Sequence, residues 1–175
     1  MGLSSDAPLL RAIDAVSGTA GRLAAVMAAL LVLLVFGLVL ARYGFGLGSV
    51  AMQEAVLWLH AGIFLLGLGM AFRHDRHVRV DVFSARWSAR TRARVELAGI
   101  VLFLLPLCVF AVWISADYVA ASWNAREGSR DPGGLPGWYL LKALIPLSAA
   151  LLALQGIGQA LRAARVAFPG EQPGA

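Results

Sequence analysis

Long apolar stretches alternate with polar segments along this chain. Asp, Glu, Lys and Arg are absent from residues 23–41, 55–72, 97–116 and 143–161, which hold 18 to 20 residues each. A helix rises about 1.5 Å per residue and needs about 20 residues to cross a 30 Å hydrocarbon core. The Leu- and Ala-rich composition favours helices over the alternating strands of a membrane barrel. The pattern predicts an all-α fold in one domain over residues 1–175, an integral membrane bundle of four transmembrane helices at about 22–43, 51–72, 95–121 and 139–162.

The distribution of basic residues indicates how these helices cross the membrane. Loops rich in Lys and Arg stay on the cytoplasmic side. Eleven bases lie in the terminal segments and in residues 73–94, whereas the other two loops carry only Arg42, Arg126, Arg130 and Lys142. We therefore expect both termini and the 73–94 loop to be cytoplasmic, and residues 44–53 and 124–138 to lie outside.

The cytoplasmic loop at 73–94 contains seven Arg and no Lys. A helix that starts near Ser84 would place Arg86, Arg90 and Arg94 on one face. Such a basic amphipathic segment suits the surface of an anionic phospholipid leaflet. The alternative interpretation is that these residues only determine the topology. Both interpretations stay open for His77, Arg79, Asp81, Arg86, Trp87, Arg90, Arg92 and Arg94.

The outer loop at 124–138 is dense in Gly and Pro, which predicts a turn-rich surface without helix. It is either a docking site for a periplasmic partner or a plain connector. Aromatic residues prefer the headgroup region, so an outer aromatic belt is expected at Tyr43, Trp123, Trp138 and Tyr139.

Two features of the spans concern helix geometry. Small residues recur every fourth position in the first and last spans, and such stripes let helices approach closely, within this chain or against another. Pro106 and Pro146 lie inside spans and should kink or locally open their helices. The small residues are Gly21, Ala25, Ala29, Gly156, Ala160 and Ala164.

Few ionisable residues lie in the spans, and each is a functional candidate because burial in lipid is costly. Glu54 either pairs with Arg42 or a partner subunit, or is a solvated acid at a helix N-terminus. Lys142 is expected to snorkel to the interface. His60 has no second histidine at a similar depth, so a hydrogen-bonded packing role is favoured over haem ligation or proton relay.

Composition then excludes several classes of function. Hydrophobic residues make up 59% of the chain and charged residues 14%, which is too apolar for an ordinary soluble domain. The net charge of +5 comes from bases between apolar runs, so nucleic acid is not an expected partner. One cysteine, Cys108, excludes an internal disulfide or a cysteine metal site. No cofactor, metal or catalytic group is expected, and an enzyme is not indicated.

Several short motifs, taken in order, resemble the small DctQ-like membrane subunit of tripartite ATP-independent periplasmic (TRAP) transporters. The resemblance extends over residues 30–161, although Ala51-Met52-Gln53 stands where many members carry a Trp before the acid. The motifs are Arg42-Tyr43-Gly44-Phe45-Gly46, Gln53-Glu54, Trp58, Gly67-Leu68-Gly69, His77-Val78-Arg79-Val80-Asp81, Gly134-Leu135-Pro136-Gly137-Trp138, Lys142-Ala143-Leu144-Ile145-Pro146 and Gln155-Gly156.

The resemblance implies a three-part importer in a bacterial inner membrane. In such a transporter a periplasmic solute-binding receptor delivers an organic acid or related solute to a large multi-span membrane subunit, which an ion gradient drives. The small subunit braces the large one. Rival hypotheses are a stand-alone oligomeric channel or exporter, and a membrane redox or haem protein. Candidate partner or scaffold residues are Arg42, Tyr43, Glu54, Trp58, Pro136, Trp138, Lys142 and Pro146.

Overall fold

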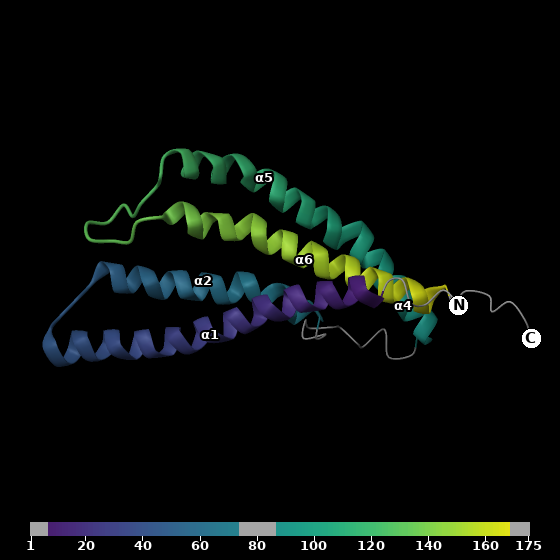
Figure 1. The fold of residues 1–175 in the computed structure, drawn as a ribbon, viewed down its shortest axis with the longest axis horizontal. Coiled ribbons are helices and arrows are strands. Elements are labelled where there is room, and N and C mark those ends of the chain that lie inside the picture. Colours follow the sequence, from purple (N-terminus) through teal and green to yellow (C-terminus); the bar gives the residue numbers. More distant parts are fainter. Residues whose placement is uncertain (1–6, 74–86, 169–175) are drawn as a thin grey trace, which may run out of the picture.

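The computed structural model describes residues 7–73 and 87–168, and most of these residues are helical (Figure 1). Four helices are long and apolar enough to cross a membrane, which confirms the predicted all-α fold with four spanning helices. The elements are α1 (Ala7–Phe45), α2 (Val50–Arg73), α4 (Ala89–Gly99), the π-helix η1 (Ile100–Leu104), α5 (Leu105–Asn124) and α6 (Trp138–Ala167).

The helices form two antiparallel hairpins, α1 with α2 and α5 with α6, which meet where α2 packs against α6 (Figure 1). The N-terminal part of α1 crosses onto α6, and α4 also packs on α6. The hairpins converge at the end where both termini lie, here called the terminal end, and spread apart toward the opposite, loop end. The core is therefore thickest at the terminal end, and α1 and α5 form the two outer edges.

Glycines permit the closest helix contacts. A Cβ added at Gly156 of α6 would lie 2.8 Å from Cδ2 of Leu104, and one at Gly21 of α1 would collide with Met70 of α2. Close approach at small residues is a main source of helix association in lipid, where the hydrophobic effect does not drive it. Both glycines of the predicted stripes thus pack within this chain.

The two prolines in the spans differ in their effects. Immediately before Pro106 the helix widens into η1, where the N–H of Leu105 donates to the carbonyl of Ile100, five residues back. Proline has no N–H to continue the ordinary ladder, so the local opening expected at Pro106 is found there. At Pro146, α6 continues without interruption, and the hydroxyl of Ser148 donates to the carbonyl of Ile145 at 2.8 Å.

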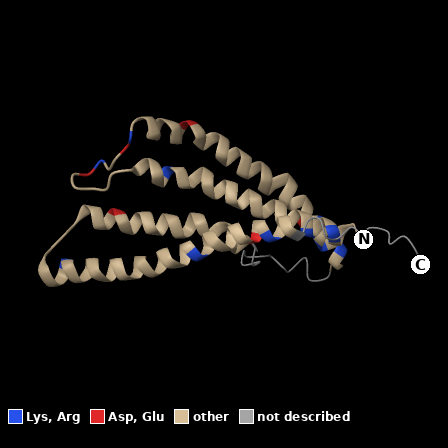
Figure 2. Ribbon diagram, viewed as in Figure 1, with Lys and Arg blue, Asp and Glu red and all other residues tan. Residues whose placement is uncertain are grey.

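Charged side chains concentrate at the two ends of the molecule (Figure 2). The terminal end carries most of the Lys and Arg of the described residues, and the loop end carries acids and bases together. Between the ends the ribbon is mostly uncharged. The charged groups that can form contacts between helices therefore lie mostly at these two ends.

Candidate functional site

The carboxylate of Glu54, near the start of α2, binds the outer loop. It accepts hydrogen bonds from the hydroxyl of Ser129 and, at 2.5 Å, from the backbone N–H of Leu135. Glu54 is only 8% exposed, so these two donors replace the water that a free carboxylate would hold. Arg42 is exposed on α1 and is not among these donors, so the Arg42–Glu54 ion pair, one of the alternatives for Glu54, is not formed in the described part of the chain.

The loop is folded tightly around this contact. Ser129 accepts from the N–H of Asp131 at 3.0 Å, and its own N–H donates to the carbonyl of Leu135 at 3.0 Å. A Cβ at Gly134 would overlap the Ser129 side chain and lie 2.8 Å from Oε1 of Glu54. Gly137, with φ +86°, then starts α6. The outer loop is thus a structured element attached to α2.

A second anchor ties the start of the loop to α6. The ammonium of Lys142 lies 2.5 Å from Oε2 of Glu127, and Ser122 of α5 donates to the same oxygen at 2.6 Å. The hydrogen bond from Lys142, followed by that from Ser122, lowers the pKa of Glu127 below its usual range. Lys142 also lies 4.2 Å from the ring centroid of Tyr118. The ammonium of Lys142 is thus held by an ion pair with the outer loop, and its predicted snorkelling to the interface stays a prediction.

A pocket of about 620 Å³ opens between these two anchors. Its wall comes from the start of α2, the end of α5, the outer loop and the start of α6. It combines acidic and basic groups with aromatic rings, so its chemistry suits a polar surface contact more than an apolar ligand. Among the described residues, no group of three or more His, Cys, Asp or Glu side chains could hold a metal ion. Its polar and aromatic lining includes Glu54, Tyr118, Glu127, Arg130, Trp138 and Lys142.

Tryptophans lie beneath the loop. The indole nitrogens of Trp58 and Trp138 are buried and make no hydrogen bond of good geometry, although that of Trp138 lies close to Glu54. The ring of Trp58 would be 3.7 Å from a Cβ at Gly137. Pro136, by contrast, is exposed on the loop.

The residues expected to form the outer aromatic belt all lie at the loop end. Trp123 and Tyr139 contact each other in a tilted arrangement, with ring centroids 4.8 Å apart, and Tyr43 is 83% exposed at the end of α1. Trp138 instead lies half-buried against the pocket. The loop end is thus rich in aromatic side chains, of which some serve packing and others face outward.

His60 is exposed on α2, so the packing role favoured for it is not filled by the described part of this chain. No hydrogen bond holds its ring in the described residues, and the spanning part of α2 presents it outward. The chain alone therefore leaves a hydrogen-bonding side chain on the surface of a spanning helix.

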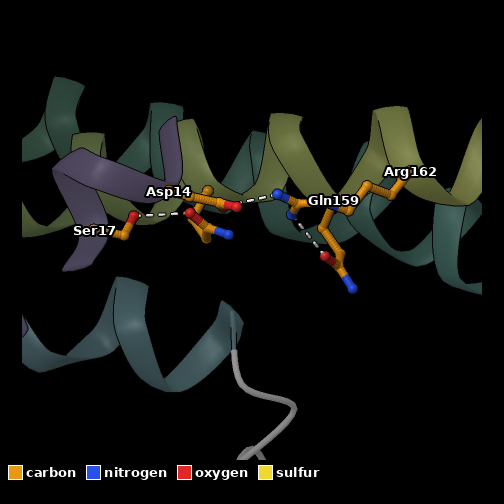
Figure 3. Close-up of polar contacts among 5 residues, drawn as sticks. Asp14, Ser17, Gln159 and Arg162 are labelled. Atoms are coloured by element: carbon orange, nitrogen blue, oxygen red, sulfur yellow. Dashed lines mark hydrogen bonds and ion pairs between the residues drawn. The ribbon is translucent and has the colours of Figure 1, made fainter. Parts of the chain in front are cut away.

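Sequence reasoning missed a polar cluster at the terminal end (Figure 3). Ser17 of α1 donates to Oε1 of Gln155 at 2.8 Å, and Arg162 of α6 binds Asp14 of α1 at 2.7 Å. Arg162 also donates to Gln159, whose amide donates to Glu96 of α4 at 3.1 Å. The signal lay in the spacing: positions 14 and 17 share one helix face, as do 155, 159 and 162.

The Arg-rich segment begins its described part at Trp87, which is 40% exposed. Ser88 caps α4 by accepting from the N–H of Thr91 at 3.1 Å, so this helix starts at Ala89. Arg90, Arg92 and Arg94 are all exposed, and the guanidinium of Arg94 lies 5.6 Å from the ring centroid of Phe168. The other candidates of this segment, and the expected helix start near Ser84, lie outside the described residues: His77, Arg79, Asp81 and Arg86.

Four spanning helices, with polar side chains engaged at both ends, define a multi-pass membrane protein. The family model described as "Tripartite ATP-independent periplasmic transporters, DctQ component" matches residues 13–166. This chain therefore belongs to the DctQ family and is the small membrane subunit of a TRAP transporter, a component that works with a large membrane subunit and a periplasmic binding protein. A comparison with curated proteins gives no match.

Proposed function

We propose that this subunit scaffolds the large membrane subunit during ion-gradient-driven import of an organic acid or related solute across a bacterial inner membrane. The observation that carries the proposal is the outward apolar surface of the spanning helices. Only 6% of the most apolar window of α1 and 11% of that of the α4–α5 rod, residues 89–124, is buried within the chain. Such helices need lipid or another membrane protein around them.

The engagement of the polar side chains supports a bracing role over solute handling. At the loop end, Glu54 binds the outer loop, and Glu127 binds Lys142. At the terminal end, Asp14 and Arg162 bind each other. These groups fix the positions of helices and loop, which is the work of a scaffold.

The anchored outer loop is proposed to help seat the solute-loaded receptor. Two anchors hold the loop in one conformation, so its exposed Arg126, Arg130 and Asp131 are presented in a fixed arrangement. A preorganised surface loses less conformational entropy when a partner binds.

Both termini are proposed to lie in the cytoplasm, with Arg90, Arg92 and Arg94 against anionic phospholipid. These three Arg side chains are exposed at the terminal end, where a basic surface gains about 1 kcal/mol per charge from an anionic leaflet. Lipid binding here would fix the depth of the subunit in the membrane.

Co-purification tests the scaffold proposal. A tagged chain co-expressed with its large subunit should retain that subunit in mild detergent, and failure to retain it would contradict the proposal. Liposomes that contain only this chain should show no solute or ion flux; flux would favour the stand-alone channel or exporter. A haem absorption band in the purified chain would favour the redox protein.

A further inference from the structure

The helix α2 carries a narrow exposed stripe of mixed character. Among residues 50–72, whose exposure the structure describes, only Gln53, Leu57, His60 and Phe64 are exposed, at successive spacings of four, three and four. The rest of α2 is at least half covered, because it packs between α1 and α6 (Figure 1). Spacings of this kind form the contact line along which one helix packs on another.

His60 makes lipid a poor cover for this stripe. It lies ten residues after the start of α2, or about 15 Å along a helix that has to cross a hydrocarbon core of about 30 Å. An imidazole ring always has a nitrogen that donates or accepts a hydrogen bond, and hydrocarbon supplies no partner. Ionisable side chains at this depth face protein or water-filled cavities.

The outer face of α5 shows the contrasting case. Its exposed residues in the middle of the span are mostly aliphatic or aromatic, and Val109, Phe110 and Ile114 are all more than half exposed. This composition matches a surface in contact with lipid tails. The stripe on α2 differs from it by an amide side chain, Gln53, and an ionisable imidazole, His60.

Two pockets continue the line of the stripe. At the loop end, Gln53 and Leu57 line the 620 Å³ pocket together with Tyr118 of α5. At the terminal end, a pocket of about 330 Å³ lies between Phe72 of α2 and the α4–α5 rod, with Phe103 and Leu107 on the rod side. A pocket lined by both α2 and the α4–α5 rod therefore lies at each end of the span.

We propose that one membrane-spanning helix of the large subunit packs along the α2 stripe, between α2 and the α4–α5 rod. A hydroxyl, amide or carboxyl side chain of that helix forms a hydrogen bond with His60. The proposal rests on the scaffold function and adds to it the face and the chemistry of the contact. Gln53 supplies a second polar contact nearer the loop end. Leu57 packs between Gln53 and His60, and Phe64 packs beyond His60, toward the terminal end.

Photo-cross-linking tests the location of this contact in the co-expressed complex. A photoreactive phenylalanine analogue at Leu57 or Phe64 should cross-link to the large subunit. The same analogue at Val109 should not cross-link. Val109 lies two residues after Leu107, which is about 200° around the helix axis, so it is on the opposite face of α5 from the pocket that Leu107 lines. Cross-links to a second copy of this chain, or reaction with lipid alone, would overturn the proposal even if the wild-type complex still co-purifies. Loss of co-purification itself would instead contradict the scaffold function.

A substitution tests the hydrogen bond. His60→Leu keeps an apolar surface suited to insertion but removes the polar group, and should lower the amount of large subunit retained by roughly three- to fifteenfold. His60→Gln should retain more than His60→Leu, because an amide can still form a hydrogen bond. Phe110→Leu on the outer face of α5 is the matched control and should not change retention. Equal retention by the His60→Leu and wild-type chains would refute a hydrogen bond at His60.

Discussion

Ser17 of α1 and Gln155 of α6, 138 positions apart in the sequence, form a 2.8 Å hydrogen bond in which both side chains are almost completely buried. Asp14, one turn before Ser17 on α1, and Arg162, two turns after Gln155 on α6, join the same two helices through an ion pair. The first and last helices of the chain are thus joined by polar contacts where the two hairpins converge. Directional bonds of this kind fix the register of two helices more sharply than apolar contacts do.

Replacing Ser17 by Ala tests this register. The Nε2 atom of Gln155 is already buried without a partner, and Ser17→Ala would leave its Oε1 without the Ser17 donor as well. We expect a loss of about 1–3 kcal/mol in the free energy of unfolding, measured by denaturation in detergent. Thr19→Ala is the control, since the hydrogen bonds of this exposed hydroxyl go to Ala15 and Arg22, both in the same helix.

The double substitution Ser17→Ala with Gln155→Leu separates burial from bonding. It removes both polar partners, so no group is left unsatisfied, and its free energy of unfolding should exceed that of Ser17→Ala alone. A double variant whose loss of stability relative to the wild type equals the sum of the losses of Ser17→Ala and Gln155→Leu would show that the two residues act independently.

The sequence predicted the elements well because their signal is local. Each run without charged residues lies in a helix, and the opening expected at Pro106 appears in η1, which ends two residues before it. The first membrane span was predicted to begin at about residue 22, and the helix that contains it begins earlier, at Ala7. Arg11 and Asp14 lower the hydropathy of this segment, but they do not disfavour a helix, and Asp14 binds α6.

The polar contacts could not be predicted in the same way because they join distant parts of the chain. Nothing near Glu54 in the sequence points to Ser129, which lies 75 positions away. Arg42 was the nearest base in sequence, yet the loop supplies neutral donors instead. Likewise, His60 was expected to be a packing residue, and only the way α2 lies between α1 and α6 reveals that its face is open.

Gly134 tests the tight fold of the outer loop. In Gly134→Ala the new methyl group would overlap Ser129 and press on Glu54, so the loop should detach from α2 at a cost of about 1–3 kcal/mol. Limited proteolysis of the loop should become faster. Gly128→Ala is the matched control, because its Cβ would meet only the Cα of Pro136 at an ordinary 3.9 Å.

Glu54→Gln tests the other side of the same contact. The amide keeps the size of the side chain but has one acceptor oxygen for two donors, and it loses the charge that strengthens both bonds. Hydrogen exchange at the N–H of Leu135 should be about tenfold faster. Asp117→Asn changes an exposed acid on α5 and should leave this exchange rate unchanged.

The ion pair between Glu127 and Lys142 makes the second anchor dependent on pH. The pKa of Glu127 is lowered in the folded protein, so its contribution is present above the ordinary value of 4.5 and is lost as the pH falls through the lowered pKa. Proteolysis of the outer loop should therefore be constant from pH 7 to about 5 and increase below that range. Glu127→Gln should show fast proteolysis throughout, and an equal acid response in that variant would assign the effect to another group.

Charge reversal of the described arginines of α4 tests whether they set the topology and bind lipid. Arg90→Glu, Arg92→Glu and Arg94→Glu together replace three bases at the terminal end by acids, and about 1 kcal/mol of attraction to an anionic leaflet is lost with each base removed. Positive residues next to a span also keep it oriented. The triple variant should therefore insert less completely or place its 73–94 loop on the wrong side. A cysteine introduced at Ala89, in a Cys108→Ala background, would be labelled with a membrane-impermeant reagent to show on which side of the membrane it lies.

The matched variant in which the same three arginines are replaced by Gln separates the two roles, because it removes the attraction to lipid without adding acids. Correct orientation with weaker binding to anionic vesicles would assign these arginines to lipid binding. Inverted orientation would assign them to topology.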